Sequence, residues 1–487
     1  MTKFLGISAF SHDASVSVVQ DGKILFGSHS ERYTRVKNDK NLSDTLIKEA
    51  LEYGKPDAIA FYERPLLKRT RQLYSGQYNK AFDPVTVEGK IRAALPGLCD
   101  IPIEYVSHHE SHAAAGAYTS GFDDACVVVA DAIGEWDCLS IWKYNNGKLK
   151  KLYSQKYPNS LGLFYTAITE RVGLKPNEDE YILMGMAAYG NPIYADQMEE
   201  DFFYKEKLAK TKINLHHGCL GYLDGADIYD LAASAQVVIE RKLHEIFKHS
   251  KRVYPSDNLV YMGGVALNCS ANHIVRTYYT DSWIMPNPGD AGSSLGSCLS
   301  LNNGPVQWNG PYIGKAIYGT YPVERIVETI QKEQILGVAS GKAEFGPRAL
   351  GNRSLFADPR GHDIKDRVNA IKKRQEFRPF APVILEELAD EYFVMGNIKS
   401  SPYMQYTFDC RYPDDFPAIV HKDNTSRVQT VNENDHPELY ATLKLFYEKT
   451  GCPMLLNTSL NIKGQPIVNT RKDADDFEQH YGVRVIS

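Results

Sequence analysis

The sequence lacks a long apolar run, a large excess of one charge and closely paired cysteines. Its longest apolar stretches, such as residues 126–130, are far shorter than the roughly 20 residues that cross a bilayer. The N-terminus reaches His12 and Asp13 without a leader-like apolar core, so we expect neither a signal peptide nor a membrane span. A net charge of -5 gives no general attraction to nucleic acid.

The eight cysteines are scattered, and no two of them form a CxxC pair. This spacing indicates neither a disulfide framework nor a zinc site made of cysteines, so a reducing cytoplasm fits best. At 487 residues, with 43% hydrophobic and 24% charged residues, the chain is typical of an enzyme-sized globular protein with two or three domains. The cysteines are Cys99, Cys126, Cys138, Cys219, Cys269, Cys298, Cys410 and Cys452.

One pattern of strand, polar turn, strand, tight turn and strand occurs twice. Asp21-Gly22 and Asn146-Gly147 are typical of two-residue hairpin turns. Such duplicated hairpins followed by helices are typical of actin-like, sugar-kinase-like phosphotransfer folds, in which the first turn of each half faces a nucleotide. The strands are expected at 4–10, 15–20 and 24–26 in the first copy, and at 125–130, 138–144 and 149–152 in the second.

Four residues have the chemistry of a mixed nitrogen and oxygen metal site. His108 and His112 are four apart and share one face of an expected helix. Asp131 ends an apolar strand, and Asp290 stands in a glycine-rich loop at a helix start. Such a set suits iron, manganese or zinc better than magnesium. The alternatives are solvent-facing histidines and aspartates that only cap helices.

A strand at 259–262 runs into Gly263-Gly264 and a further element that begins at 265–268. Glycines at a strand-to-helix junction let phosphate or ribose approach the backbone, although such pairs are more often plain turns.

Together, residues 108–113, Asp131, 263–268 and 287–296 resemble the O-carbamoyltransferases of nodulation-factor, cephamycin and tobramycin biosynthesis. The N-terminal domain of these enzymes is similar to the tRNA threonylcarbamoyl transferase. The resemblance implies one bound metal, commonly iron, that touches the phosphates of a nucleotide. The implied metal ligands are His108, His112, Asp131 and Asp290, and the implied nucleotide-binding residues are Gly263, Gly264 and Asn268.

Two further stretches resemble motifs of that family. Residues 11–15 resemble its HDAS motif, and residues 30–37 its EERxxRxK motif, with Ser30 in place of the first glutamate. By this resemblance His12 is the general base on the acceptor hydroxyl, and Lys37 holds the carbamoyl oxygen. Without the resemblance, His12 could be an ordinary turn residue.

A third stretch, residues 177–187, resembles the family's NEGEYKVMGLA signature, with Asp179 and Ile182 in place of its glycine and lysine. If that lysine contacts phosphate in relatives, the nucleotide contacts differ here.

The segment from 344 to 378 is basic, with nine lysines and arginines against five acidic residues. Its glycines and prolines interrupt any long helix, so we expect guanidinium groups held by turns as an anion site. A nucleic-acid groove is the competing interpretation, weakened by the few aromatic residues nearby. The basic residues are Arg348, Arg353, Arg360, Lys365, Arg367, Lys372, Lys373, Arg374 and Arg378.

Lys372-Lys373-Arg374 and Ser459-Leu460-Asn461 resemble the KxR and SxN motifs of the YrdC-like fold, which makes threonylcarbamoyl-adenylate. The flanking residues 344–354 and 377–382 match the carbamoyltransferases almost letter for letter. The residues implied to bind carbamoyl phosphate and the adenylate are Arg348, Arg353, Lys372, Arg374, Arg378, Ser459 and Asn461.

The resemblance implies an α/β protein with an actin-like duplicated domain over 1–330 and a YrdC-like α+β domain over 331–487. Carbamoyl phosphate and ATP, with magnesium, give carbamoyl-adenylate, and the carbamoyl group then passes to a hydroxyl. The acceptor is a sugar, a natural product or a hydroxymethylated nucleobase in DNA; nucleic acid enters only as an acceptor. The sequence does not define the oligomeric state, and a homodimer is one option. The alternatives are a sugar-kinase-like ATP phosphotransferase and a non-catalytic nucleotide or nucleic-acid binding protein.

Overall fold

The computed structural model describes residues 2–375 and 378–487, so Phe377 of the motif at 377–382 lies outside the described residues. These residues form two compact units. The first comprises residues up to Ser30 together with Asn38–Trp308, and the second comprises Glu31–Lys37 and Asn309–Ser487. The units thus change at Trp308, upstream of residue 330, where the sequence suggested a division.

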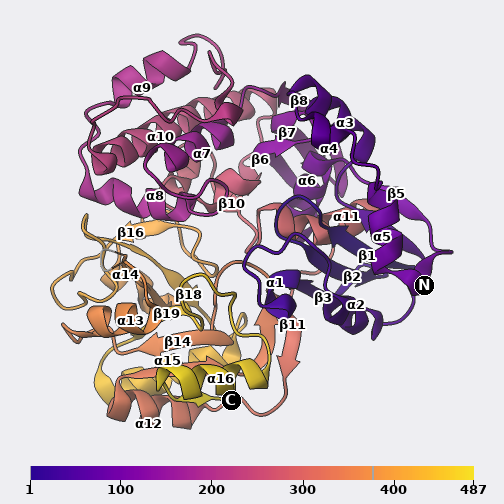
Figure 1. Ribbon diagram of the computed structural model, residues 1–487. Helices are drawn as coiled ribbons and strands as arrows, with labels where there is room; N and C mark the ends of the chain where they lie inside the picture. Colours follow the sequence, from indigo (N-terminus) through magenta and orange to yellow (C-terminus); the bar gives the residue numbers. More distant parts are fainter. Residues whose placement is uncertain (1, 376–377) are drawn as a thin grey trace. The chain divides into compact units, whose positions relative to one another are not determined.

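The first unit holds two five-stranded sheets with the same topology (Figure 1). The strand orders are β3-β2-β1-β4-β5 and β10-β9-β6-β7-β8, and in each sheet an antiparallel meander joins two parallel strands. The duplicated hairpins predicted from the sequence are therefore confirmed. The strands are β1 (Lys3–Ser8), β2 (Ser15–Gln20), β3 (Lys23–His29), β4 (Ala58–Phe61), β5 (Ile103–Tyr105), β6 (Asp124–Gly134), β7 (Asp137–Asn145), β8 (Lys148–Lys156), β9 (Asn258–Met262) and β10 (Asp281–Trp283).

Strand β6 is longer than predicted. The polar loop expected at 131–137 is mostly strand, because β6 continues to Gly134 after a shift of register that begins at Ala130. The turn shrinks to Glu135 and Trp136, and Asp131 lies within β6 rather than at its end.

Two helices lie between the sheets of the first unit. Helix α6 (His108–Thr119) packs on β6 and β9, helix α11 (Ser293–Asn302) packs on β1, β2 and β4, and the two helices contact each other. A methyl group on Gly296 would stand 1.8 Å from the Ser111 carbonyl oxygen, so glycine is required at this close approach. The contact brings the N-terminal ends of α6 and α11 together.

The other helices of the first unit cover its sheets and form its insertions. Helices α7 and α10 pack on β6, and α2 packs on β2 and β3. These helices are α2 (Asp44–Leu51), α3 (Pro65–Tyr74), α4 (Tyr78–Ala81), α5 (Val87–Ala94), α7 (Leu161–Arg171), α8 (Glu180–Met186), α9 (Ala195–Phe202) and α10 (Ile228–Val253).

The second unit is built on a six-stranded mixed sheet with the order β18-β15-β19-β14-β12-β20. Helices α12 (Val323–Glu333), α15 (Pro437–Thr450) and α16 (Arg471–Tyr481) pack on this sheet. Its strands are β12 (Ile335–Ala339), β14 (Arg353–Ala357), β15 (Ala381–Leu385), β18 (Gln429–Val431), β19 (Met454–Ser459) and β20 (Val485–Ile486).

Smaller elements complete the second unit. Strands β11 (Tyr312–Ile317) and β13 (Gly341–Glu344) pair, as do β16 (Thr407–Asp409) and β17 (Thr425–Arg427). The remaining helices are α1 (Ser30–Thr34), α13 (Ile364–Lys372) and α14 (Ala389–Tyr392). Helix α13 carries part of the basic segment that we expected in turns. Among the described residues, no helix has both the length and the apolar character needed to cross a bilayer.

Candidate active site

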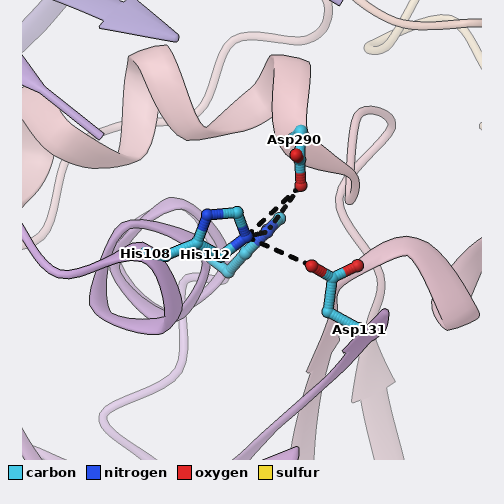
Figure 2. A group of neighbouring side chains, drawn as sticks. All are labelled: His108, His112, Asp131 and Asp290. Atoms are coloured by element: carbon cyan, nitrogen blue, oxygen red, sulfur yellow. Dashed lines mark hydrogen bonds and ion pairs between the residues drawn. The ribbon is translucent and has the colours of Figure 1, made fainter. Parts of the chain in front are cut away.

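Four side chains of the first unit converge on one point (Figure 2). His108 and His112 lie one turn apart on α6, Asp131 comes from β6, and Asp290 stands just before α11. One ligand atom from each residue lies within 4.8 Å of the others. His108 Nε2 is 3.1 Å from an Asp131 oxygen and 3.3 Å from an Asp290 oxygen, and His112 Nε2 is 3.4 Å from that Asp290 oxygen.

The geometry of this group fits a metal ion. The Nε2 atoms of His108 and His112 face each other at 3.1 Å, which leaves at most one proton between two nitrogen lone pairs. Nitrogen and oxygen ligands at about 2.1 Å from one ion lie about 3 to 4 Å apart, as these atoms do. The predicted set of four residues is therefore brought together as a group that could hold a metal.

The backbone of the Gly263-Gly264 pair positions the Asp131 carboxylate. The N–H of Gly264 donates to Asp131 Oδ1 at 3.0 Å. Gly263 has a φ of 95°, and a methyl group there would stand 2.2 Å from the Ala130 carbonyl oxygen. The Gly263-Gly264 pair that we expected at a nucleotide thus also holds β6 and the Asp131 carboxylate.

Glu135 and His109 lie next to His108, and neither was selected from the sequence. Glu135 Oε1 accepts from the backbone N–H of Arg64 at 2.5 Å and of His108 at 3.4 Å. His109 Nδ1 lies 2.7 Å from Ser140 Oγ. Burial, with the charge of His108, lowers the pKa of His109 to about 3, so this imidazole stays neutral. Glu135 has a positive φ of 54° because it lies in the tight turn between β6 and β7. The sequence alone did not locate this turn.

Opposite charges balance one another in the metal-free group. Burial lowers the pKa of His108, but the charges of Asp290 and Asp131 and their hydrogen bonds outweigh burial and raise that pKa well above its usual value. Burial raises the pKa of Asp290, yet the charges and hydrogen bonds of His108 and His112 hold it well below its usual range. The His108 imidazole is therefore favoured in its protonated form beside the Asp131 and Asp290 carboxylates.

His12 lies in the turn between β1 and β2 with Asp13 beside it. The His12 Nδ1 atom is 3.3 Å from an Asp13 oxygen, and the His12 side chain is 35% exposed. Burial lowers the pKa of His12, but the hydrogen bond and charge of Asp13, with the charge of Asp290, raise it to about 9. An imidazole held by a carboxylate has the arrangement of an oriented base.

The side chains of Asn268 and Ile182 are both buried in the interior of the first unit. The Asn268 amide pairs with the Gln236 amide at 3.0 and 3.2 Å and accepts from the Ala271 N–H. Its side chain is buried, so it acts as a support for the loop after Gly264. Ile182 is 3% exposed in α8, where it joins the core in place of the expected lysine.

The KxR and SxN motifs meet in the second unit. Lys372 Nζ donates to the Ser459 carbonyl and hydroxyl and, at 3.0 Å, to the carbonyl and Oδ1 of Asn461. Lys372 is 4% exposed. Burial lowers the pKa of its ammonium well below the usual value, and the charges of Arg374 and Arg378 lower it further. The two tripeptides, far apart in sequence, therefore form one cluster.

The arginines of the basic segment have different roles. Arg353 is fully buried, and its guanidinium donates to five backbone carbonyls, so it has no N–H left for an anion. We therefore assign Arg353 a structural role in place of the predicted one. Arg374 donates to Asn369 Oδ1 at 2.7 Å and stacks on Phe380 with its guanidinium carbon 3.9 Å from the ring centre. Arg348 and Arg378 are half-buried.

Lys37, the expected carbamoyl-holding residue, belongs to the second unit and forms an ion pair. Its Nζ lies 2.9 and 3.1 Å from the two Glu31 carboxylate oxygens. The Lys37 side chain is 43% exposed, whereas that of Glu31 is 9% exposed. The carboxylate thus fixes an ammonium that remains accessible to solvent.

Comparisons with known proteins identify the family of this chain. The family models Carbamoyltransferase N-terminus and Carbamoyltransferase C-terminus match residues 3–299, in two overlapping segments, and 327–486. Nodulation protein NolNO of Sinorhizobium fredii is 31% identical over 96% of this chain and 76% of its own length. The 3'-hydroxymethylcephem-O-carbamoyltransferase of Amycolatopsis lactamdurans is 25% identical over 95% of this chain and 94% of its own.

Solved structures are less similar. The match to HypF of T. kodakarensis spans 62% of this chain and 47% of the HypF chain, with 13% identity and a TM-score of 0.38. This likeness supports no argument about function. The family matches span most of the chain, from residue 3 to residue 486. The chain therefore belongs to the carbamoyltransferase family, and the enzyme is a carbamoyltransferase.

Proposed function

We propose that this enzyme is an ATP-dependent O-carbamoyltransferase whose two units carry two successive reactions. The second unit, with a YrdC-like fold, activates the carbamoyl group as carbamoyl-adenylate. The first unit, with an actin-like fold, transfers the carbamoyl group to an acceptor hydroxyl. The observation that carries the proposal is the meeting of Lys372 with Ser459 and Asn461, because these residues come from the two motifs expected at an adenylate-forming site.

The activation reaction needs anion binding in the second unit. Carbamoyl phosphate loses phosphate to water, the resulting carbamate oxygen attacks the α-phosphorus of ATP, and pyrophosphate leaves. Carbamoyl phosphate, carbamate and ATP are all anions, and the buried ammonium of Lys372 provides a charge that anions stabilise. Arg374, Arg348 and Arg378 are the further anion-binding residues in the proposal, whereas Arg353 supports them from the interior.

The transfer reaction needs a base in the first unit. His12 takes the proton of the acceptor hydroxyl, whose oxygen attacks the carbamoyl carbon while AMP leaves. Asp13 orients His12 and stabilises the imidazolium that forms. Lys37, which belongs to the second unit, is the residue proposed to hold the carbamoyl oxygen. His108, His112, Asp131 and Asp290 would hold one metal ion, with iron as the proposed identity, and a bound metal polarises phosphate and offsets the charge released with AMP.

The acceptor is the least defined part of the proposal. One relative bears a name that refers to a 3'-hydroxymethylcephem, whose hydroxymethyl group is an alcohol. We propose a hydroxyl on a sugar, a natural product or a hydroxymethylated nucleobase.

The test is to incubate the protein with ATP, magnesium and labelled carbamoyl phosphate. The proposal expects release of pyrophosphate that depends on carbamoyl phosphate, together with a labelled adenylate. ATP turnover without either product would contradict it. A panel of alcohols, nucleosides and hydroxymethylated DNA would then identify the acceptor by formation of a labelled carbamate ester.

A further inference from the structure

Buried polar atoms without partners gather in the second unit near β13 and β14. Arg32 is 2% exposed, and its Nη2 donates to the Gly346 carbonyl at 3.0 Å, but its Nε and Nη1 have no hydrogen-bond partner among the described residues. Glu344 is 3% exposed, and its Oε1 accepts from the N–H groups of Leu350, Asn352 and Arg353. Its Oε2 accepts from no residue that the structure describes.

A third residue of this kind is Asn469. It is fully buried, and within the described parts of the chain neither its Nδ2 nor its Oδ1 has a partner. Its backbone carbonyl accepts from Arg353 Nε and Nη2 at 3.3 and 3.2 Å. The backbone N–H of the same Arg353 donates to Glu344 at 3.2 Å. Asn469 and Glu344 are thus both attached to one arginine.

The segment Glu31–Lys37 completes the group. Arg35 donates to the carbonyls of Ile467 and Pro466 at 2.7 and 2.9 Å, just before Asn469. Arg32 reaches the Gly346 carbonyl, two residues beyond Glu344. The charges of Glu344 and Arg32 both act on Arg353, whose pKa burial lowers to about 10. Arg32, Glu344 and Asn469 are therefore connected through Gly346, Arg353 and Arg35 in the second unit.

We infer that Arg32, Glu344 and Asn469 form the subsite that recognises the planar carbamoyl group of the substrate. A carbamoyl group presents two N–H donors and one carbonyl acceptor in a plane. Glu344 Oε2 and Asn469 Oδ1 accept the two N–H groups, and Arg32 donates to the carbonyl oxygen. The inference rests on the proposed function, because it locates the carbamoyl donor in the activating unit.

Other occupants fit less well. One buried water makes about three hydrogen bonds and at most four, whereas five orphaned atoms are present on these three residues. A phosphate group would be repelled by the Glu344 carboxylate. A group with both donors and acceptors satisfies the set, and a buried polar atom left without a partner costs about 1–3 kcal/mol.

The substitution Glu344→Gln tests this subsite. Gln keeps a carbonyl oxygen for the three backbone N–H groups, but it places an NH2 donor where Oε2 accepts. The probes are phosphonoacetamide and acetonylphosphonate, which have the same shape and differ only by an amide NH2 in place of a methyl group. Calorimetric titration of the wild type should show that the amide binds roughly 100-fold more tightly, since a site built for N–H donors rejects an analogue without them.

In Glu344→Gln this preference should fall at least tenfold, measured at a temperature at which thermal unfolding shows the variant to be folded. Glu386→Gln is the matched control, because Glu386 accepts only from Thr430 and Asn432 among the described residues and should leave the preference intact. An undiminished preference in Glu344→Gln, or equal binding of both probes by the wild type, would overturn the subsite.

Asn469→Leu provides a second test, since it removes the amide but keeps the backbone carbonyl that holds Arg353. Loss of the amide preference supports the subsite. A higher melting temperature with the preference unchanged would mean that the orphaned atoms only hold water, and would overturn it. Failure of the proposed function is a separate result, namely no pyrophosphate release from wild type with ATP and carbamoyl phosphate.

Discussion

The two units carry polar clusters that suit ligands of opposite charge. In the first unit, two carboxylates and two imidazoles converge within 4.8 Å, a set of ligand atoms that suits a cation. In the second unit, Lys372 is a buried ammonium whose described hydrogen-bond partners are oxygen atoms of Ser459 and Asn461, with no carboxylate among the described residues to pair with it. In the proposed function, a cation binds to the first cluster and anions bind to the second. The two can therefore be disabled separately.

Lys372→Met should give the largest effect. It removes the buried charge and keeps the apolar stem, so pyrophosphate release should fall roughly 1000-fold, as when a preorganised donor is removed from an active site. The stability of the folded protein should change little, because the loss of a buried charge offsets the loss of its hydrogen bonds to Ser459 and Asn461. Coupled pyrophosphate detection and thermal unfolding measure the two quantities. Lys373→Met, an exposed neighbour, is the control and should keep activity.

Asp290→Asn should remove the metal from the first unit. A carboxylate that approaches both histidines is lost, so metal affinity should fall by more than about 100-fold. Equilibrium dialysis followed by elemental analysis measures bound metal. His109→Gln is the neighbouring control, since His109 contacts Ser140 rather than the carboxylates. Equal loss of metal in both variants would contradict the assigned ligands.

Gly263→Ala should affect the first unit more than the second. The φ of 95° and the 2.2 Å approach to the Ala130 oxygen leave no room for a methyl group. We expect a loss of about 2 kcal/mol in unfolding free energy and weaker metal binding, with pyrophosphate release retained. Gly221→Ala is the control, because no atom lies within 4 Å of its new methyl group.

Asp13→Asn should give the smallest effect, a shift in pH dependence. Burial lowers the pKa of His12, and Asp13 is the main group that raises it to about 9. A general base works above its pKa, so the transfer rate should rise with pH through that value. Removing the carboxylate should move the rise to lower pH by about one unit. A rise at an unchanged pH would show that another group limits transfer.

The strands and the metal group were predictable because their signals are local. The alternation of apolar residues and the Asp21-Gly22 and Asn146-Gly147 turns defined the hairpins. The four-residue spacing of His108 and His112 placed both imidazoles on one face of α6. The family resemblance added Asp131 and Asp290.

The role of Arg353 was not predictable, because the carbonyl of Asn469 that it binds lies 116 residues away. Sequence shows an arginine but not whether carbonyls already satisfy its guanidinium. The sequence also did not predict that Glu31–Lys37 packs in the second unit, because the residues on both sides of this segment belong to the first unit. The extension of β6 beyond Asp131 depends on an irregular register that no local pattern marks.

The division of labour between the units is tested most directly by His12→Ala. Pyrophosphate and carbamate ester are measured in the same reaction, with ATP, labelled carbamoyl phosphate and an acceptor identified from the alcohol panel. The account predicts that pyrophosphate release continues while ester formation falls by about 100-fold or more. Normal ester formation would contradict the role of His12 as the base, and loss of both products would contradict the separation of activation from transfer.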